Sequence, residues 1–246
     1  MAKLFKLSLV DVKNILHSKG IIVCIIGAFI YSGLWSFFAS SRLHSLIGYT
    51  FEFTRFLYVG ILYASILVIQ NDIRFNTSKV IFSGIFSRVQ IMISKFMSLI
   101  ILGFVFSIAV ELNNFITSLI LNNKIGFSGF LALNHIEIII TIIVLTFSMG
   151  SIMVLTVAIT FKNKKNTIGL VLFLSLINFY NAAIVMLSRR GAHLPKGILE
   201  YMKTPFYNAT NIMYYDFPIK SILINVTWGI IFFIGATIIM NRREIK

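Results

Sequence analysis

The stretch from Gln70 to Lys95 reads QNDIRFNTSKVIFSGIFSRVQIMISK, and it is the largest polar interruption between two long apolar runs in the first half of the chain. Its charged residues are four cations and one acid, namely Arg74, Lys79, Arg88, Lys95 and Asp72. Four apolar residues recur inside it at helical spacings, namely Ile73, Val80, Ile81 and Ile85. This spacing predicts a short helix with one apolar and one polar side. We expect that helix to lie flat against a membrane or a partner protein.

The composition excludes an ordinary soluble domain. Hydrophobic residues make up 58% of the 246 residues, charged residues make up 12%, and the mean hydropathy is +0.91. Soluble chains carry roughly twice that charged fraction. The formal net charge of +14 fits cations that flank membrane spans, and no separate basic and aromatic surface indicates a nucleic acid partner. We therefore expect one integral membrane domain over residues 1–246.

Six apolar runs are long enough to cross a bilayer. They lie at about residues 21–39, 53–69, 96–121, 136–161, 167–187 and 221–240. The first run exceeds the apolar core of a signal peptide, which is about 7 to 15 residues long, so we expect it to stay as a transmembrane helix. The predicted fold class is an all-α integral membrane protein with six transmembrane helices.

Residues 1–20 predict an amphipathic helix that lies in the cytoplasmic interface. The residues expected on its inward side are Leu4, Leu7, Val10 or Asp11, Asn14 and Ile15, and those expected on the other side are Lys3, Lys6, Lys13 and Lys19. With the amino terminus inside, the inner segments hold 14 of the 22 Lys and Arg residues. Because cytoplasmic loops are enriched in these residues, we expect both termini in the cytoplasm.

The region 188–220 would then lie outside, and it has two unusual properties. It holds five cations and all three prolines of the chain. Its segment 197–215 is apolar and aromatic, but Pro205 interrupts it and it is too short to span twice. We expect short re-entrant or interfacial helices there.

Three polar residues inside the spans are candidates for a substrate path. Glu111 lies roughly 23 Å from the start of the third run, and it acts either as a gate that contacts a cationic substrate group or as the partner of a cation such as Arg55. Asn178 and Asn181 share one face of the fifth run, where they either line a path or make interhelical hydrogen bonds. Both readings of each residue are open at this point.

The sequence offers little chemistry of its own. It contains no G-x-x-x-x-G-K-[ST] phosphate-binding loop, no H-E-x-x-H and no G-x-S-x-G. His135 and Glu137 resemble two metal ligands but have no third ligand nearby, so we interpret them as interfacial anchors. We expect no catalytic residue, no metal and no cofactor bound by this chain.

In its architecture the chain resembles the membrane subunits of ABC-2 type (type V exporter-like) ABC transporters. Members of that family show an acidic residue, then Gly-Thr, then a helix that ends in Pro-x-Ser-Arg, and then a Ser-Lys pair at the start of the third span. The corresponding positions here are Asp72, Asn76-Thr77, Ser87-Arg88 and Ser94-Lys95. Two positions depart from this pattern, because Asn76 replaces the Gly and Ile85 or Phe86 stands where Pro is common.

The resemblance implies a partner for the 70–95 loop. A separate cytoplasmic ABC ATPase, which binds ATP and Mg, would contact a coupling helix at about 76–86. The residues implied in this coupling are Asp72, Asn76, Thr77, Val80, Ile81, Ile85 and Arg88. A second membrane subunit, either another copy or a paralogue, would complete the path. Because the second and fifth spans line it in relatives, the resemblance places Tyr63, Ser65, Asn178 and Asn181 there, and Glu111 is the further candidate.

The function expected from this resemblance is that of a permease subunit in an ATP-driven exporter. Small subunits of this kind are similar to bacteriocin-immunity transporters and to bacterial exporters of peptides such as phenol-soluble modulins. The expected cargo is therefore an amphipathic or hydrophobic peptide, or a lipid-like molecule. Two alternatives from other classes are a membrane protein that sequesters a toxic peptide at 188–220, and an intramembrane enzyme that uses Glu111 or His135.

Overall fold

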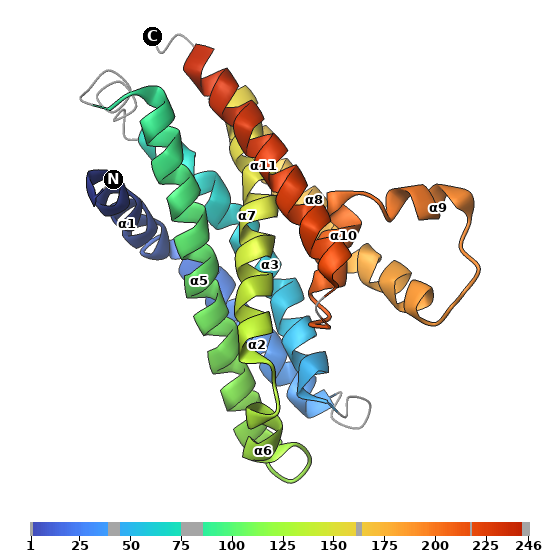
Figure 1. Ribbon diagram of the computed structural model, residues 1–246. Helices are drawn as coiled ribbons and strands as arrows, with labels where there is room; N and C mark the ends of the chain where they lie inside the picture. Colours follow the sequence, from blue (N-terminus) through green and yellow to red (C-terminus); the bar gives the residue numbers. More distant parts are fainter. Residues whose placement is uncertain (1, 39–44, 75–85, 161–163, 217, 243–246) are drawn as a thin grey trace.

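The computed structural model describes residues 2–38, 45–74, 86–160, 164–216 and 218–242, and these residues form helices without any β-strand among them (Figure 1). The helices are α1 (Ala2–Leu16), α2 (Lys19–Phe38), α3 (Leu46–Arg74), α5 (Arg88–Ile120), α6 (Gly126–Leu131), α7 (His135–Thr160), α8 (Lys164–Arg189), α9 (Lys196–Tyr201), α10 (Pro205–Ile212) and α11 (Ile219–Arg242). Six of them, α2, α3, α5, α7, α8 and α11, are long and apolar enough to cross a membrane. The predicted all-helical, multi-pass class is confirmed.

Two spans, α3 and α5, extend furthest beyond the apolar runs that predicted them. Helix α3 begins at Leu46 and ends at Arg74, beyond the predicted 53–69, and α5 begins at Arg88 rather than near residue 96. The prediction stopped at charged residues, whereas the structure pairs those charges. Arg55 bonds Glu52 one turn away on α3 at 2.8 Å, for example. A paired charge removes the reason for the helix to end at the edge of the apolar run.

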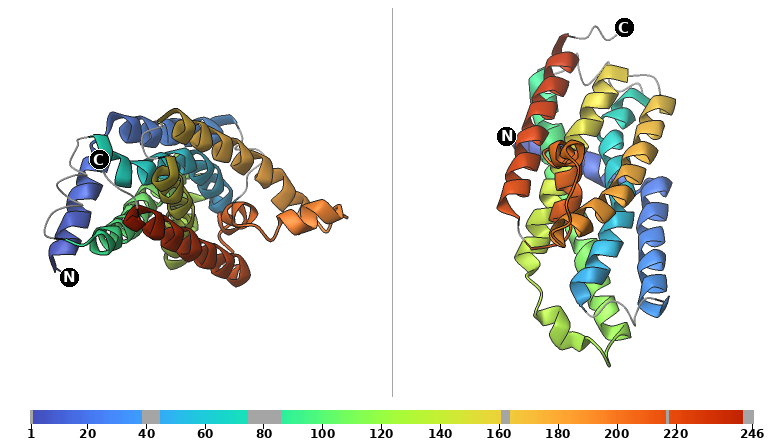
Figure 2. Two further views of the ribbon diagram at one scale, coloured as in Figure 1. Left: turned by 90° about the horizontal axis from the view of Figure 1, so that it is seen from above. Right: turned by 90° about the vertical axis from the view of Figure 1, so that its right-hand side faces the viewer.

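Helices α3 and α7 form the centre of the bundle. In their most apolar windows 72% of the residues are buried, against 22% in α2 and in α11. The two views of Figure 2 agree that α2 and α11 lie on opposite outer sides. Close contacts of glycines hold α7 in place, since a Cβ added at Gly103 of α5 would lie 2.8 Å from the Cα of Ile143. Such small residues let the backbones of membrane helices approach each other.

The long helices run alternately up and down, so the segments that connect them lie at the two ends of the bundle (Figure 1). The amino terminus, the start of α5 and the end of α11 lie at one end. The turn that carries α6 lies at the opposite end. The short α6 was not predicted, and it begins at Gly126, whose φ of +63° is a conformation that favours glycine.

Helix α1 exists as predicted, but the residues that it buries differ from those expected. Leu4 and Ile15 are buried as predicted, whereas Leu7 is half-buried and Val10 is 48% exposed. The remaining buried residues are Ser8 and Val12. The reason is that α1 packs against α5 and α3 and turns Asp11 toward them. The face of α1 that makes these contacts therefore includes Asp11 together with Leu4 and Ile15, and it is not the most apolar face.

The region before the sixth span contains two short helices, α9 and α10, as the proline-interrupted segment predicted. In α10 the side chain of Thr204 caps the first turn by accepting a hydrogen bond from the backbone N–H of Tyr207, and Pro205 follows at the first position of the helix. Helix α10 packs against α8, α11 and α7, whereas α9 extends away from the bundle (Figures 1 and 2). The region is therefore anchored to the bundle through α10.

Candidate functional site

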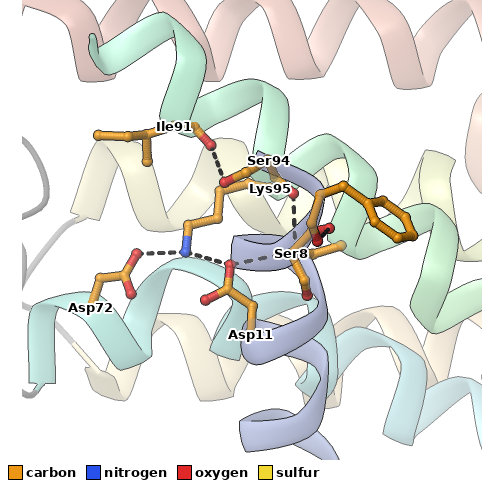
Figure 3. Close-up of polar contacts among 8 residues, drawn as sticks. Ser8, Asp11, Asp72, Ile91, Ser94 and Lys95 are labelled. Carbon is orange, nitrogen blue, oxygen red and sulfur yellow. Dashed lines mark hydrogen bonds and ion pairs between the residues drawn. The ribbon is translucent and has the colours of Figure 1, made fainter. Parts of the chain in front are cut away.

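A buried charge cluster joins three helices at the end of the bundle that carries the amino terminus. Lys95 of α5 is 1% exposed, and its ammonium lies 2.8 Å from the Asp11 Oδ2 of α1 and 2.6 Å from the Asp72 Oδ2 of α3. Figure 3 shows the lysine side chain extending from α5 between the two carboxylates. We call Asp11, Asp72 and Lys95 the charge triad.

Local sequence around the start of α5 sets the position of Lys95. Ser87 caps the helix, because its side chain accepts a hydrogen bond from the N–H of Gln90 at 3.2 Å and the Gln90 side chain accepts one from the N–H of Ser87 at 2.9 Å. This capping box fixes the first turn, and Lys95 follows two turns later. Ser98, one turn beyond Lys95, is fully buried, and its hydroxyl lies 3.4 Å from the Asp11 carboxylate. Its small size allows the backbone of α1 to approach α5.

The electrostatics of the triad are unbalanced, since two carboxylates face one ammonium. Burial raises the pKa of the Asp11 carboxyl above its ordinary range, and the attraction of Lys95 opposes this effect only in part. A buried charge whose partner is removed is strongly destabilising. The three side chains are therefore mutually dependent, and α1, α3 and α5 are tied together through them.

The triad lies directly beside the predicted coupling segment. Helix α3 ends at Arg74, two residues after Asp72, and α5 begins at Arg88, seven residues before Lys95. The predicted coupling residues Asn76, Thr77, Val80, Ile81 and Ile85 lie outside the described residues. The helices on either side of this segment are thus bonded to each other by Asp72 and Lys95, and both are bonded to α1 by Asp11.

Arg88, the last predicted coupling residue, makes an internal contact. Its Nη1 donates hydrogen bonds to the carbonyl oxygens of Asn241 at 2.9 Å and Met240 at 3.3 Å. These carbonyls belong to the last turn of α11, where a cation is favourable because the helix dipole is negative there. Arg88 therefore ties the start of α5 to the end of the sixth span. Its role toward an ATPase stays a prediction.

The predicted path residues on α3 lie in packed surroundings. Ser65 is fully buried, its Oγ donates to the carbonyl oxygen of Ile61 at 2.7 Å, and it lies against Gly150 of α7. Tyr63 is half-buried, and its ring lies so close to Gly20 of α2 that a Cβ there would be 2.5 Å from the Cε1 atom. These two residues face different neighbouring helices.

The two asparagines of α8 face one neighbour, as their spacing predicted, and that neighbour is the region before the sixth span. Asn178 Oδ1 accepts a hydrogen bond from Thr210 at 2.8 Å. Asn181 donates to the carbonyl oxygen of Phe206 at 3.0 Å and accepts from the hydroxyl of Tyr201 at 2.7 Å. Both asparagines are buried and dock α9 and α10 onto α8, which matches the interhelical reading of these residues.

Glu111 pairs with a residue that the sequence did not connect to it. Its Oε2 lies 2.9 Å from Nδ1 of His135, at the start of α7, whereas Arg55 bonds Glu52. The suggested partnership of Glu111 with Arg55 is thus absent from the described contacts, because Glu52 lies closer along α3. Across the part of the chain that the structure describes, no three His, Cys, Asp or Glu side chains are grouped to hold a metal ion.

Asp11 is the member of the charge triad that the sequence interpretation left undecided. The available signal was weak: Asp11 is the only acid among the first 51 residues, but a lysine near the start of an apolar span usually extends to the interface without an acidic partner. Asp72 and Lys95 were both singled out as motif positions, but their contact was not predicted. Comparison with protein-family models finds no match for this sequence, and comparison with curated proteins finds none either.

Proposed function

We propose that this chain is the permease subunit of an ATP-driven exporter of amphipathic or hydrophobic peptides. In this proposal both termini lie in the cytoplasm of a bacterial cell, α1 lies in the inner interface, and α9 and α10 lie at the outer side as interfacial or re-entrant helices. A separate ATPase binds ATP and Mg, and a second membrane subunit faces this one across the path.

The charge triad is the observation that carries the proposal. A segment that receives mechanical work must be connected to the helices that move. Asp72 and Lys95 bond the helices on both sides of the 75–85 segment, and Asp11 extends the connection to α1. Arg88 adds α11 through the carbonyls of its last turn. A displacement of this segment would therefore act on α1, α3, α5 and α11 together.

The exposed surface of α1 supports an interfacial position for this helix. Beside its buried face it exposes Phe5 and Leu9, which are 50% and 44% exposed, and its lysines Lys3, Lys6 and Lys13 are exposed as well. A helix with apolar and cationic exposed faces is typical of the boundary between lipid headgroups and acyl chains. This position places α1 where it meets both the membrane and the predicted ATPase side.

The proposed coupling step is mechanical. ATP binding closes the two ATPase subunits, and the segment at 76–86 moves with them. The apolar side formed by Val80, Ile81 and Ile85 is buried against the ATPase in this proposal, and cations of the loop meet acidic groups at the rim. Because the charge triad joins the flanking helices, the movement reaches the spans and switches the path from inward to outward access.

Co-purification from the native membrane tests the proposal. We expect an ATPase with a phosphate-binding loop to co-purify with the tagged full-length chain and to hydrolyse ATP. Ile81→Asp places a charge on the predicted apolar side and is expected to reduce the retained ATPase at least tenfold. The matched control is Ser83→Asp, which adds the same charge on the predicted polar side and is expected to retain the ATPase.

Two results would contradict the proposal. In the first, no ATPase is retained by the unchanged chain under conditions that keep it folded. In the second, Ile81→Asp and Ser83→Asp retain the ATPase equally, which would remove the coupling role from the apolar side of this segment.

A further inference from the structure

A pocket that contains charged side chains lies where the fifth and sixth spans meet the region between them. Its volume is about 650 Å³, and its wall includes Arg189 at the end of α8, Asn211 of α10 and Lys220 at the start of α11. Lys203, which follows α9, completes a set of three cations. One acid, Asp216, lines the pocket with them. The pocket therefore carries an excess of positive charge.

Arg189 is held rigidly in this pocket. Its guanidinium donates two hydrogen bonds to Asp216, at 2.7 and 3.0 Å, and one to Asn211 Oδ1 at 2.9 Å. It also lies over the ring of Tyr214, 4.3 Å from the ring centroid. Asp216 thus compensates Arg189, and the remaining cations of the pocket are the two lysines.

These lysines are available to an anion. Both side chains are exposed, and Lys203 pairs with Glu200, one turn away on the surface, in an ion pair whose members are 70% and 71% exposed. Such an exposed pair contributes little and is readily exchanged. Lys220 makes no ion pair with any residue that the structure describes. The pocket therefore offers two ammonium groups beside a fixed guanidinium.

The depth of the pocket decides which anion it fits. The candidate span of α8 ends at Arg189 and that of α11 begins at Ile219, so the pocket lies at the ends of two long apolar helices. Phosphate groups of phospholipids lie where membrane-spanning helices end. The helix surfaces next to the pocket are apolar and exposed, with Leu187 on α8 and Leu223 on α11 at 48% and 61% exposure. These surfaces are where acyl chains would extend from a headgroup in the pocket.

We propose that this pocket binds the phosphate of an anionic phospholipid, with Lys203 and Lys220 contacting the phosphate oxygens and the acyl chains lying along α8 and α11. The site requires neither an ATPase nor a peptide, and only its placement at the outer side rests on the proposed function. It gives a physical reason for three of the five cations in the 188–220 region, Arg189, Lys203 and Lys220.

Native mass spectrometry of the full-length chain tests this inference, with phosphatidylglycerol and phosphatidylcholine as probes. We expect the chain to retain one phosphatidylglycerol in preference to phosphatidylcholine. Each lysine near an anionic lipid contributes roughly fivefold in affinity, so the double variant Lys203→Gln with Lys220→Gln is expected to bind phosphatidylglycerol on the order of 25-fold more weakly. Arg189 is left unchanged because its substitution would also disturb Asn211 and Asp216.

The charge-matched control is the double variant Arg190→Gln with Lys196→Gln, which changes two cations of the same region that do not line the pocket. The inference holds if this control changes phosphatidylglycerol binding less than twofold. Equal losses in the two double variants would overturn it, as would equal retention of phosphatidylcholine. If glycerol phosphate at equal concentration displaces phosphatidylglycerol, the pocket binds a soluble phosphate instead. If an acidic amphipathic peptide displaces phosphatidylglycerol, the pocket binds cargo instead. Either result overturns the lipid assignment.

Discussion

Replacing Lys95 by methionine is the sharpest perturbation of the charge triad. Methionine has nearly the same length and a high helix propensity, so the substitution removes the ammonium while α5 keeps its local preference. The carboxylates of Asp11 and Asp72 are then left buried and facing each other. Both bonded the same nitrogen, at 2.8 and 2.6 Å, so their oxygens lie no farther apart than those two lengths together.

The geometry gives the magnitude. Two unit charges about 5 Å apart repel by about 3 kcal/mol at an effective dielectric constant of about 20. Loss of one partner from a buried ion pair costs about 3 to 5 kcal/mol in measured cases, which agrees with this value. We therefore expect Lys95→Met to lower the free energy of unfolding by about 3 to 5 kcal/mol at neutral pH.

Denaturant or thermal unfolding of the detergent-solubilised chain measures this loss. The matched control is Lys13→Met, the same change at an exposed lysine of α1, and it is expected to stay within about 0.5 kcal/mol of the unchanged chain. A triple variant, Lys95→Met with Asp11→Asn and Asp72→Asn, removes all three charges. It is expected to be more stable than Lys95→Met alone, because the repulsion between the two carboxylates is removed.

Two outcomes would refute this reasoning. A Lys95→Met variant as stable as the Lys13→Met control would show that the ammonium does not hold the two carboxylates in the folded chain. A triple variant no more stable than Lys95→Met would show that the loss comes from packing rather than from repulsion between the carboxylates.

Three further predictions concern helix packing, the protonation of Asp11 and one buried hydrogen bond. Gly103→Ala is expected to destabilise the chain by about 1 to 3 kcal/mol because its Cβ meets the α7 backbone, whereas Gly33→Ala, with no atom within 4 Å, is expected to leave the unfolding midpoint unchanged or raise it. Because burial raises the pKa of Asp11, the folded chain keeps the carboxyl proton to a higher pH than the unfolded chain, in which the ordinary pKa is 3.8. The free energy of unfolding of the unchanged chain, compared with that of Asp11→Asn, should therefore fall as the pH rises above about 4. A difference between the two chains that stays constant from pH 4 to 7 would contradict this. Tyr215→Phe removes the 2.6 Å hydrogen bond to Thr54 and should cost about 1 to 2 kcal/mol, and in a double-mutant cycle with Thr54→Val the two losses should not add.

The sequence was sufficient to predict the membrane class because long apolar runs leave few alternatives. The sequence did not predict where the spans begin and end, because it does not show whether a charged residue has an oppositely charged neighbour in the folded chain. Glu52 and Arg55 were placed at a boundary, yet they pair within α3 and the helix continues through them. Lys95 likewise lies inside α5 because two carboxylates neutralise it.

Asp72 and Lys95 of the charge triad were singled out from the sequence, but Asp11 was left undecided and the cluster was not predicted. Periodicity placed Asn178 and Asn181 on one face correctly, but it could not tell that this face meets α10. For α1, periodicity favoured the most apolar arc, whereas the structure turns Asp11 inward to pair with Lys95 and leaves Val10 48% exposed. Contacts between residues 84 positions apart, such as Asp11 with Lys95, are set by helix packing.

ATP-dependent transport is the measurement that tests the proposed function most directly. The chain and its co-purified ATPase are reconstituted in vesicles with the ATPase facing outward, and the uptake of a fluorescent amphipathic peptide is followed with and without ATP. We predict that uptake requires ATP, persists in Ser83→Asp and is lost in Ile81→Asp. Uptake that is independent of ATP, or that is unchanged by Ile81→Asp, would contradict the account of a permease driven through its 76–86 segment.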